Sequence, residues 1–194
     1  MAKSGKIKEL ELKNINEQNT VLQKTVFDLG ALDIEKGQIM QRYKAALEVL
    51  DETKKSKYVD RIVVSTEDNK IKDLCVQNNI EVQDRPLELS DDHTEKMDVI
   101  EYTTKKLIDE GYEPDIVISL QSNSPEFKGI DLDKGIEFFL EELYNDHPIC
   151  EVMSINPDML QNGCFRIMTT KTVFQKTLSI HVGVFMTDYI DVHN

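Results

Sequence analysis

The sequence predicts an α/β domain whose parallel sheet is covered by helices on both faces, preceded by a helical arm. From residue 58 onward, short apolar runs with strand character alternate with segments of helical periodicity. Residues 1–57 differ, because they contain no proline and are rich in Glu, Lys, Gln and Leu. We therefore expect a helical arm over residues 1–57 and an α/β domain over residues 58–194.

A heptad pattern fits much of the arm. Its two apolar positions are occupied by Ile15, Leu22, Leu29, Tyr43 and Leu50, and by Leu32, Ile39 and Ala46. Gln18, Thr25 and Lys36 interrupt the seam, and Gly30 and Gly37 each weaken a helix by roughly 1 kcal/mol relative to Ala. The pattern predicts either a coiled coil, through which the chain forms a homo-oligomer, or a surface helix packed on the following domain.

Strands and helices alternate after the arm. The expected strands are Arg61–Ser65, Ile80–Val82, Ile116–Leu120, Glu151–Ile155, Cys164–Met168 and Ile180–Met186. Three helices are expected between them: one with a face of Ile71, Leu74 and Cys75, one from Met97 to Ile108, and one starting near Asp131. The face of the third helix is Leu132, Ile136, Phe139, Leu140 and Leu143. This alternation predicts a parallel sheet, with the strands near Ile62 and Ile116 ending at the same edge.

One strand carries a polar cluster at its end. Ile116–Leu120 is a nearly continuous apolar run, typical of a strand buried on both faces, and Gln121–Ser124 follows before Pro125. Ligands bind at the carboxyl ends of strands in open α/β sheets. The cluster is therefore a candidate ligand site, and an ordinary turn is the alternative.

Charge and composition narrow the class of partner. The 194 residues carry a formal net charge of -13, with 30% charged and 40% hydrophobic residues, which indicates a folded soluble protein. This charge argues against binding to a nucleic acid polymer, which requires a basic surface. It leaves a nucleotide open, because a divalent cation can bridge phosphates to carboxylates.

The cysteines and the apolar windows indicate a cytoplasmic protein that does not enter a membrane. Cys75, Cys150 and Cys164 are odd in number and lack metal-ligand spacing, so we expect free thiols in a reducing compartment. The start of the sequence lacks the apolar run of a signal peptide, and no window is long and apolar enough to cross a bilayer.

Several motifs occur in an order that matches one enzyme family. They are Tyr58–Asp68, Asp84–Ser90, Asp98–Ile100, Leu120–Pro125 (Leu-Gln-Ser-Asn-Ser-Pro), Asn162-Gly163 and Ile190–Val192. Together they resemble the acylneuraminate (CMP-sialic acid) cytidylyltransferase family. The resemblance implies a Rossmann-like, three-layer nucleotide-diphospho-sugar transferase fold. It also implies an enzyme that transfers CMP from CTP to an acidic 2-keto sugar with Mg²⁺.

The resemblance assigns roles to matching residues. Asp191 would be catalytic and would hold the magnesium ion, and Arg85 would be catalytic through contact with a nucleotide phosphate or sugar. Residues matching the substrate-binding positions are Gln121, Ser122, Asn123, Ser124, Asn162 and Gly163. A surface arginine and an ordinary turn are the alternatives for Arg85 and for Asn162-Gly163.

The chain departs from the family pattern at important positions. The family's N-terminal strand and basic, glycine-rich phosphate loop have no counterpart, His193 replaces a second acidic residue, and Phe127 replaces an arginine. The stretch between Ile155 and Asn162 is short. We therefore expect a divergent or truncated member, incomplete at both ends and weak or inactive alone. The alternatives are a non-catalytic scaffold or oligomerisation protein, and a nucleotidyltransferase acting on a different sugar.

Overall fold

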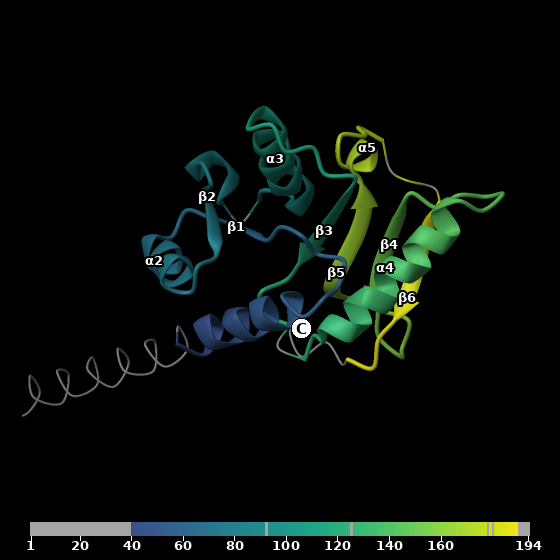
Figure 1. The fold of residues 1–194 in the computed structure, drawn as a ribbon, viewed down its shortest axis with the longest axis horizontal. Helices are drawn as coiled ribbons and strands as arrows, with labels where there is room; N and C mark the ends of the chain where they lie inside the picture. The colour runs from purple at the N-terminus through teal and green to yellow at the C-terminus, as the bar shows by residue number, and fades with distance from the viewer. Residues whose placement is uncertain (1–39, 92, 125, 178, 180, 190–194) are drawn as a thin grey trace, which may run out of the picture. The chain divides into compact units, whose positions relative to one another are not determined.

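A computed structural model describes residues 40–91, 93–124, 126–177, 179 and 181–189 (Figure 1). The chain divides into two compact units, Met1–Tyr43 and Lys44–Asn194, and nearly all described residues belong to the second. Residues 40–53 are helical, whereas the heptad positions up to Ile39 lie outside the described residues. In the described part of the chain, no helix has the length and apolar character needed to span a membrane.

The first two strands form a small parallel sheet. β1 (Val63–Thr66) pairs with β2 (Glu81–Asp84), and α2 (Asn69–Gln77) connects them. Asp68 caps α2 by accepting hydrogen bonds from the backbone N–H groups of Lys70 and Ile71, as its position before a helical pattern predicts. A short 3-10 helix, η1 (Leu87–Leu89), lies in the polar loop after β2.

The other four described strands form a mixed sheet in the order β3-β5-β4-β6. The strands are β3 (Ile116–Leu120), β4 (Glu151–Ile155), β5 (Gln161–Thr169) and β6 (Val182–Met186). The helices around them are α3 (Lys96–Asp109), α4 (Gly129–Leu143) and the short α5 (Thr170–Val173). β5 runs antiparallel to β3 and β4, whereas β6 runs parallel to β4.

The α/β fold class is confirmed, but the sheet differs from a wholly parallel one. Only residues 156–160 separate β4 from β5, and so short a connection joins antiparallel neighbours, whereas a parallel pair needs a long crossover. β1 and β3 were expected in one sheet, but they belong to separate sheets in the described part of the chain.

The core lies between α4 and one face of the mixed sheet (Figure 1). Leu132, Ile136 and Phe139 of α4 are at most 3% exposed, which confirms the predicted apolar face of this helix. They pack in one buried cluster with strand residues such as Val152, Phe165 and Ile167, and with Val49 and Phe127. A fully buried Leu or Phe contributes about 1.5–3 kcal/mol, so this cluster holds the sheet and α4 together.

Residues 44–57, which the sequence predicts as part of the arm, pack against the start of α4. The Gly129 N–H donates to the Glu52 carboxylate at 3.1 Å, and the Ser56 hydroxyl donates to Asp133 Oδ1 at 2.5 Å. A Cβ at Gly129 would overlap the backbone carbonyl oxygen of Glu52 and would lie 3.4 Å from the Lys55 side chain. Only glycine allows this close approach of the two helices.

Candidate functional site

The candidate site is centred on the contact between Gln121 and Gly163. Gln121 follows β3, and Gly163 lies in β5, the antiparallel neighbour of β3. Gly163 has φ of +70°, and a Cβ at this position would lie 2.7 Å from Cδ of Gln121 and closer still to its amide nitrogen. The backbone conformation therefore favours glycine, and any larger residue would also push the end of the Gln121 side chain aside.

The Gln121 amide group has unused hydrogen-bonding capacity. The side chain is half-buried, and neither its oxygen nor its nitrogen bonds to another described residue. A primary amide offers two donors and an acceptor, so it can bind a group that carries both. Gln121 therefore presents an available polar group at the carboxyl end of β3.

The residues after Gln121 form a turn that is anchored in the core. Ser122 and Asn123 are exposed, and the Ser124 N–H donates to the Gln121 carbonyl at 3.4 Å. The Phe127 N–H then donates to the Ser124 carbonyl at 3.1 Å, and the Phe127 side chain is fully buried. Phe127 stands where the sequence pattern described above has an arginine, and its buried side chain fixes the end of this turn.

Asn162 is held inside the sheet by its own side chain. Its Oδ1 accepts from the Ser154 hydroxyl at 2.6 Å, and its Nδ2 donates to the Thr187 hydroxyl at 2.6 Å. The residue is 6% exposed. A direct contact between this amide and a ligand would require these two hydrogen bonds to break, and in the structure they hold Asn162, the neighbour of Gly163, to Ser154 and Thr187.

This network sits where the ladder between β4 and β5 is irregular. Met153 pairs with Arg166 and Ile155 pairs with Gln161, so β5 contains extra residues that have no partner on β4. The Ser154 hydroxyl accepts a hydrogen bond from the Phe165 N–H at 3.0 Å and thereby replaces a missing ladder bond. The bulge turns Gly163 toward Gln121, and side-chain hydrogen bonds stabilise it.

Arg85 is paired with Glu67, the residue that follows β1. Arg85 Nε donates to Glu67 Oε2 at 2.9 Å, and Nη2 donates to the same oxygen. Burial raises the pKa of the Glu67 carboxyl, but hydrogen bonds from Arg85, from its own backbone N–H and from Ser90 outweigh this effect, and the net pKa is lowered. Glu67 is therefore ionised at neutral pH. The Nη1 group of Arg85 has no partner among the described residues.

The chain after β6 returns to the start of α4. The Tyr189 hydroxyl donates to the Asp131 carboxylate, and the Tyr189 ring packs against the main core cluster. Burial, followed by the Asp131 contact, raises the pKa of the Tyr189 hydroxyl well above its usual range, so the phenol stays protonated. Asp191 and His193 lie outside the described residues.

The described residues do not form a metal site by themselves. No group of three or more His, Cys, Asp or Glu side chains is placed to hold a metal ion within the ranges that the structure describes. Glu67 is already paired with Arg85, and Asp131 with Lys134 and Tyr189. Neither carboxylate is free to serve as an uncommitted ligand.

The structure brings some of the predicted site residues together and leaves others apart. Gln121 and Gly163 are in contact, with Asn162 beside Gly163, and the Ser122–Ser124 turn continues from Gln121. No hydrogen bond or ion pair between described residues joins Arg85 to this group.

Sequence reasoning missed the partners of the predicted residues. The sequence contained a local signal for Glu67, because this residue directly follows the strand that ends at Thr66. A charged residue at the carboxyl end of a strand is a candidate partner for Arg85. No local sequence pattern indicated the roles of Ser154 and Thr187 or the contact between Tyr189 and Asp131. Each depends on pairing between segments that are distant in the sequence.

Comparison with known proteins gives consistent similarities. A family model described as cytidylyltransferase matches residues 47–175. Among solved structures, one similar chain is a CMP:2-keto-3-deoxy-manno-octonic acid synthetase complexed with CTP, with 16% identity, a TM-score of 0.47, and coverage of 58% of this chain and 41% of that chain. Another is a cytidylyltransferase from Leptospira borgpetersenii serovar Hardjo-bovis, with 21% identity, a TM-score of 0.46, and coverage of 65% and 49%. This chain thus spans less than half the length of either structure, and no curated protein sequence matches it.

Proposed function

Because this chain belongs to the cytidylyltransferase family, we propose that it transfers CMP from CTP to an acidic 2-keto sugar of the sialic acid type. In this reaction a sugar hydroxyl oxygen attacks the α-phosphorus of CTP. The bond from that phosphorus to the bridging oxygen breaks, and pyrophosphate leaves with that oxygen. The hydroxyl proton passes to solvent. Catalysis of such a step depends mainly on positioning and on stabilising phosphate charge.

The observation that carries this proposal is the free amide of Gln121 above Gly163. A side chain at Gly163 would displace this amide, so the glycine leaves room for a polar group at the carboxyl end of β3. We assign Gln121 to substrate binding, with Ser122, Asn123 and Ser124 as neighbours on the same turn. Asn162 and Gly163 are assigned to the same site. Asn162 holds this part of β5 in place through its hydrogen bonds, and Gly163 leaves room for the Gln121 side chain because it has no side chain of its own.

Arg85 is proposed to contact a nucleotide phosphate through Nη1. Two of its other N–H groups are committed to Glu67, which fixes the guanidinium plane and leaves one end of the fork available. The same pairing also reduces the net positive charge that Arg85 can offer. We therefore expect weak binding of the triphosphate by this chain alone.

Magnesium remains part of the proposal through Asp191, which follows Tyr189 by two residues in the sequence. When bound, the ion would neutralise phosphate charge. Since the described carboxylates near the site are already paired, we assign no step to the metal.

A non-catalytic scaffold is the second candidate, and one observation favours it. The only predicted cation of the described site, Arg85, is neutralised by Glu67 in a chain whose net charge is -13. A site that binds a triphosphate needs several positive groups or amides, because phosphate charges are costly to desolvate. If this candidate is correct, the domain keeps its fold without turning over CTP.

One assay separates the two candidates. Pyrophosphate release is measured from CTP and Mg²⁺ over a panel of acidic 2-keto sugars, including sialic acid and 2-keto-3-deoxy-manno-octonic acid. The proposal predicts sugar-dependent release that falls by about 10²–10³ in Gln121→Ala, the range for loss of one preorganised donor. Gln77→Ala, an exposed glutamine at the end of α2, is the matched control and should retain full activity. Absence of release with every sugar would favour the scaffold.

A further inference from the structure

The contact between Gln121 and Gly163 belongs to a closed ring of contacts around the candidate site. One half of this ring is the chain from Gln121 to Asp131. The Ser124 N–H donates to the Gln121 carbonyl at 3.4 Å, and the Phe127 N–H donates to the Ser124 carbonyl at 3.1 Å. Helix α4 begins two residues after Phe127 and has Asp131 in its first turn. Hydrogen-bonded turns, rather than an open loop, therefore connect Gln121 to Asp131.

The other half of the ring is the short segment after β6. The buried Thr187 donates its N–H to the Ile155 carbonyl at 2.9 Å and its hydroxyl to the same oxygen at 3.2 Å. The Thr187 hydroxyl also accepts a hydrogen bond from Asn162 Nδ2 at 2.6 Å. Two residues later, the Tyr189 hydroxyl donates to the Asp131 carboxylate. Residues 187–189 thus connect the bulge between β4 and β5 to the first turn of α4, and they close the ring.

The Tyr189 hydroxyl closes this ring through one side-chain hydrogen bond. Its acceptor is a carboxylate, and such a bond is roughly twice as strong as one between neutral groups. Asp131 also lies 3.4 Å from Nζ of the exposed Lys134, which is a neighbour on the same helix. Tyr189, by contrast, comes from a segment that is distant in the sequence, and its ring packs against the main core cluster. The bond therefore fixes α4 to the chain that follows β6.

We propose that Tyr189 is a positioning residue, whose hydroxyl keeps the Gln121 amide over Gly163 by holding the first turn of α4 in place. The Gln121 side chain bonds to no other described residue, so its position depends on the backbone that carries it. That backbone runs directly into α4. Tyr189 need not touch the substrate to affect its binding. This effect on binding rests on the proposed function, in which Gln121 binds the substrate.

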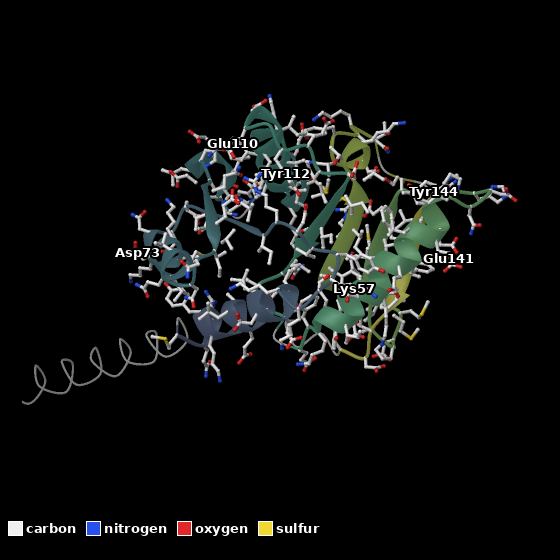
Figure 2. All side chains as sticks on the ribbon, in the orientation of Figure 1. Lys57, Asp73, Glu110, Tyr112, Glu141 and Tyr144 are labelled. Atoms are coloured by element: carbon white, nitrogen blue, oxygen red, sulfur yellow. The ribbon has the colours of Figure 1, made fainter. Side chains whose placement is uncertain are left out.

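Tyr189→Phe tests the proposal, because it keeps the aromatic ring in the core and removes only the hydroxyl. Tyr112→Phe is the matched control (Tyr112 is labelled in Figure 2). The Tyr112 hydroxyl also lies 3.0 Å from a carboxylate, that of Asp60, but Tyr112 precedes β3 whereas Gln121 follows it. Both variants lose a hydrogen bond from a phenol to a carboxylate, so they differ in the place where the bond is lost.

Nuclear magnetic resonance of the full, isotopically labelled chain without ligand gives two measurements. The first is the nuclear Overhauser effect between the Gln121 side-chain amide protons and the Gly163 α protons. The second is the hydrogen exchange rate of the Phe127 amide. In Tyr189→Phe the Overhauser effect should weaken, and the Phe127 amide should exchange at least about tenfold faster, as expected for loss of one hydrogen bond to a charged group. Tyr112→Phe should leave both values as in the unmodified chain.

Three results would overturn the proposal. Neither value changes in Tyr189→Phe, both values change equally in the two variants, or the amide of the fully buried Val152 in β4 exchanges faster by the same factor as that of Phe127. The last result would show a general loss of stability instead of a local release of the turn.

Calorimetric titration with CTP adds a measurement that a purely structural role would not change. If the unmodified chain binds CTP, Tyr189→Phe should weaken binding by no more than Gln121→Ala does. In a chain that already carries Gln121→Ala, it should have no further effect, and two additive losses would contradict the proposal. If the unmodified chain does not bind CTP, the proposed function fails, whereas the Overhauser effect and the exchange rate still decide the role of Tyr189.

Discussion

Replacing Gly163 with alanine tests the contact at the centre of the candidate site. Gly163 has φ of +70°, a region that costs an L-residue about 1–2 kcal/mol. The new methyl group would also lie within 2.7 Å of Cδ of Gln121 and force that side chain away. A displaced, off-rotamer side chain costs about 0.5–1.5 kcal/mol more. We expect Gly163→Ala to lose both contributions in the free energy of unfolding, measured by urea denaturation.

Gly111→Ala is the matched control for the backbone contribution. Gly111 has φ of +91°, and a Cβ there would have nothing within 4 Å. In Gly111→Ala the free energy of unfolding should fall only by the backbone contribution of about 1–2 kcal/mol. This corresponds to a decrease of roughly 2–8 °C in melting temperature for a domain of this size.

The double variant Gly163→Ala with Gln121→Ala isolates the contact itself. Without the Gln121 side chain there is nothing for the new methyl group to displace, so the additional loss of stability should disappear. The double-mutant cycle should therefore give a coupling energy of about 0.5–1.5 kcal/mol. A coupling near zero, together with equal losses in Gly163→Ala and Gly111→Ala, would show that Gln121 does not lie over Gly163.

Three further predictions concern the surroundings of the site. The pKa of Glu67 is lowered, so its pairing stabilises the fold above pH 4.5 and this contribution is lost as pH falls through the folded value. In urea unfolding, Glu67→Gln should therefore lose about 0.5–1 kcal/mol at pH 6 and less as the pH is lowered below 4.5, and a loss that does not change with pH would contradict the pairing. Phe127→Ala should lose about 3–5 kcal/mol, against less than about 0.5 for the exposed Ile130→Ala, and similar losses would mean that the turn is not anchored in the core. Asn162→Ala should lose about 1–3 kcal/mol, because the buried Ser154 O–H loses its acceptor and the buried Thr187 hydroxyl loses one of its two hydrogen bonds; a neutral effect would rule out the network that links β4, β5 and β6.

Local patterns in the sequence predict most of the secondary structure. The helical face of α4, the cap at Asp68 and the end of α3 near Gly111 follow from residue type and spacing over a few positions. The strands near Ile116 and Glu151 follow from apolar runs bounded by polar residues. Each of these features depends on neighbours along the chain, so the sequence contains the signal directly.

Pairing between distant segments is what the sequence did not predict. An apolar run predicts a buried strand but not which strand lies beside it, so the antiparallel partner of β3 and the separate β1–β2 sheet were missed, and β3 is only half-buried at the end of its sheet in the described part of the chain. The partners of Arg85 and Asn162 were missed for the same reason, because Glu67 and Ser154 lie beside them only in the folded chain.

Binding of CTP measured by isothermal titration calorimetry tests the central claim most directly. If the site of this family member is centred on Gln121, the full chain binds CTP with Mg²⁺, Gln121→Ala weakens binding at least about tenfold, equivalent to roughly 1.4 kcal/mol, and Gln77→Ala leaves it unchanged. Equal affinity for CTP in all three proteins would place the nucleotide elsewhere, and no binding by the full chain would contradict the proposed cytidylyl transfer.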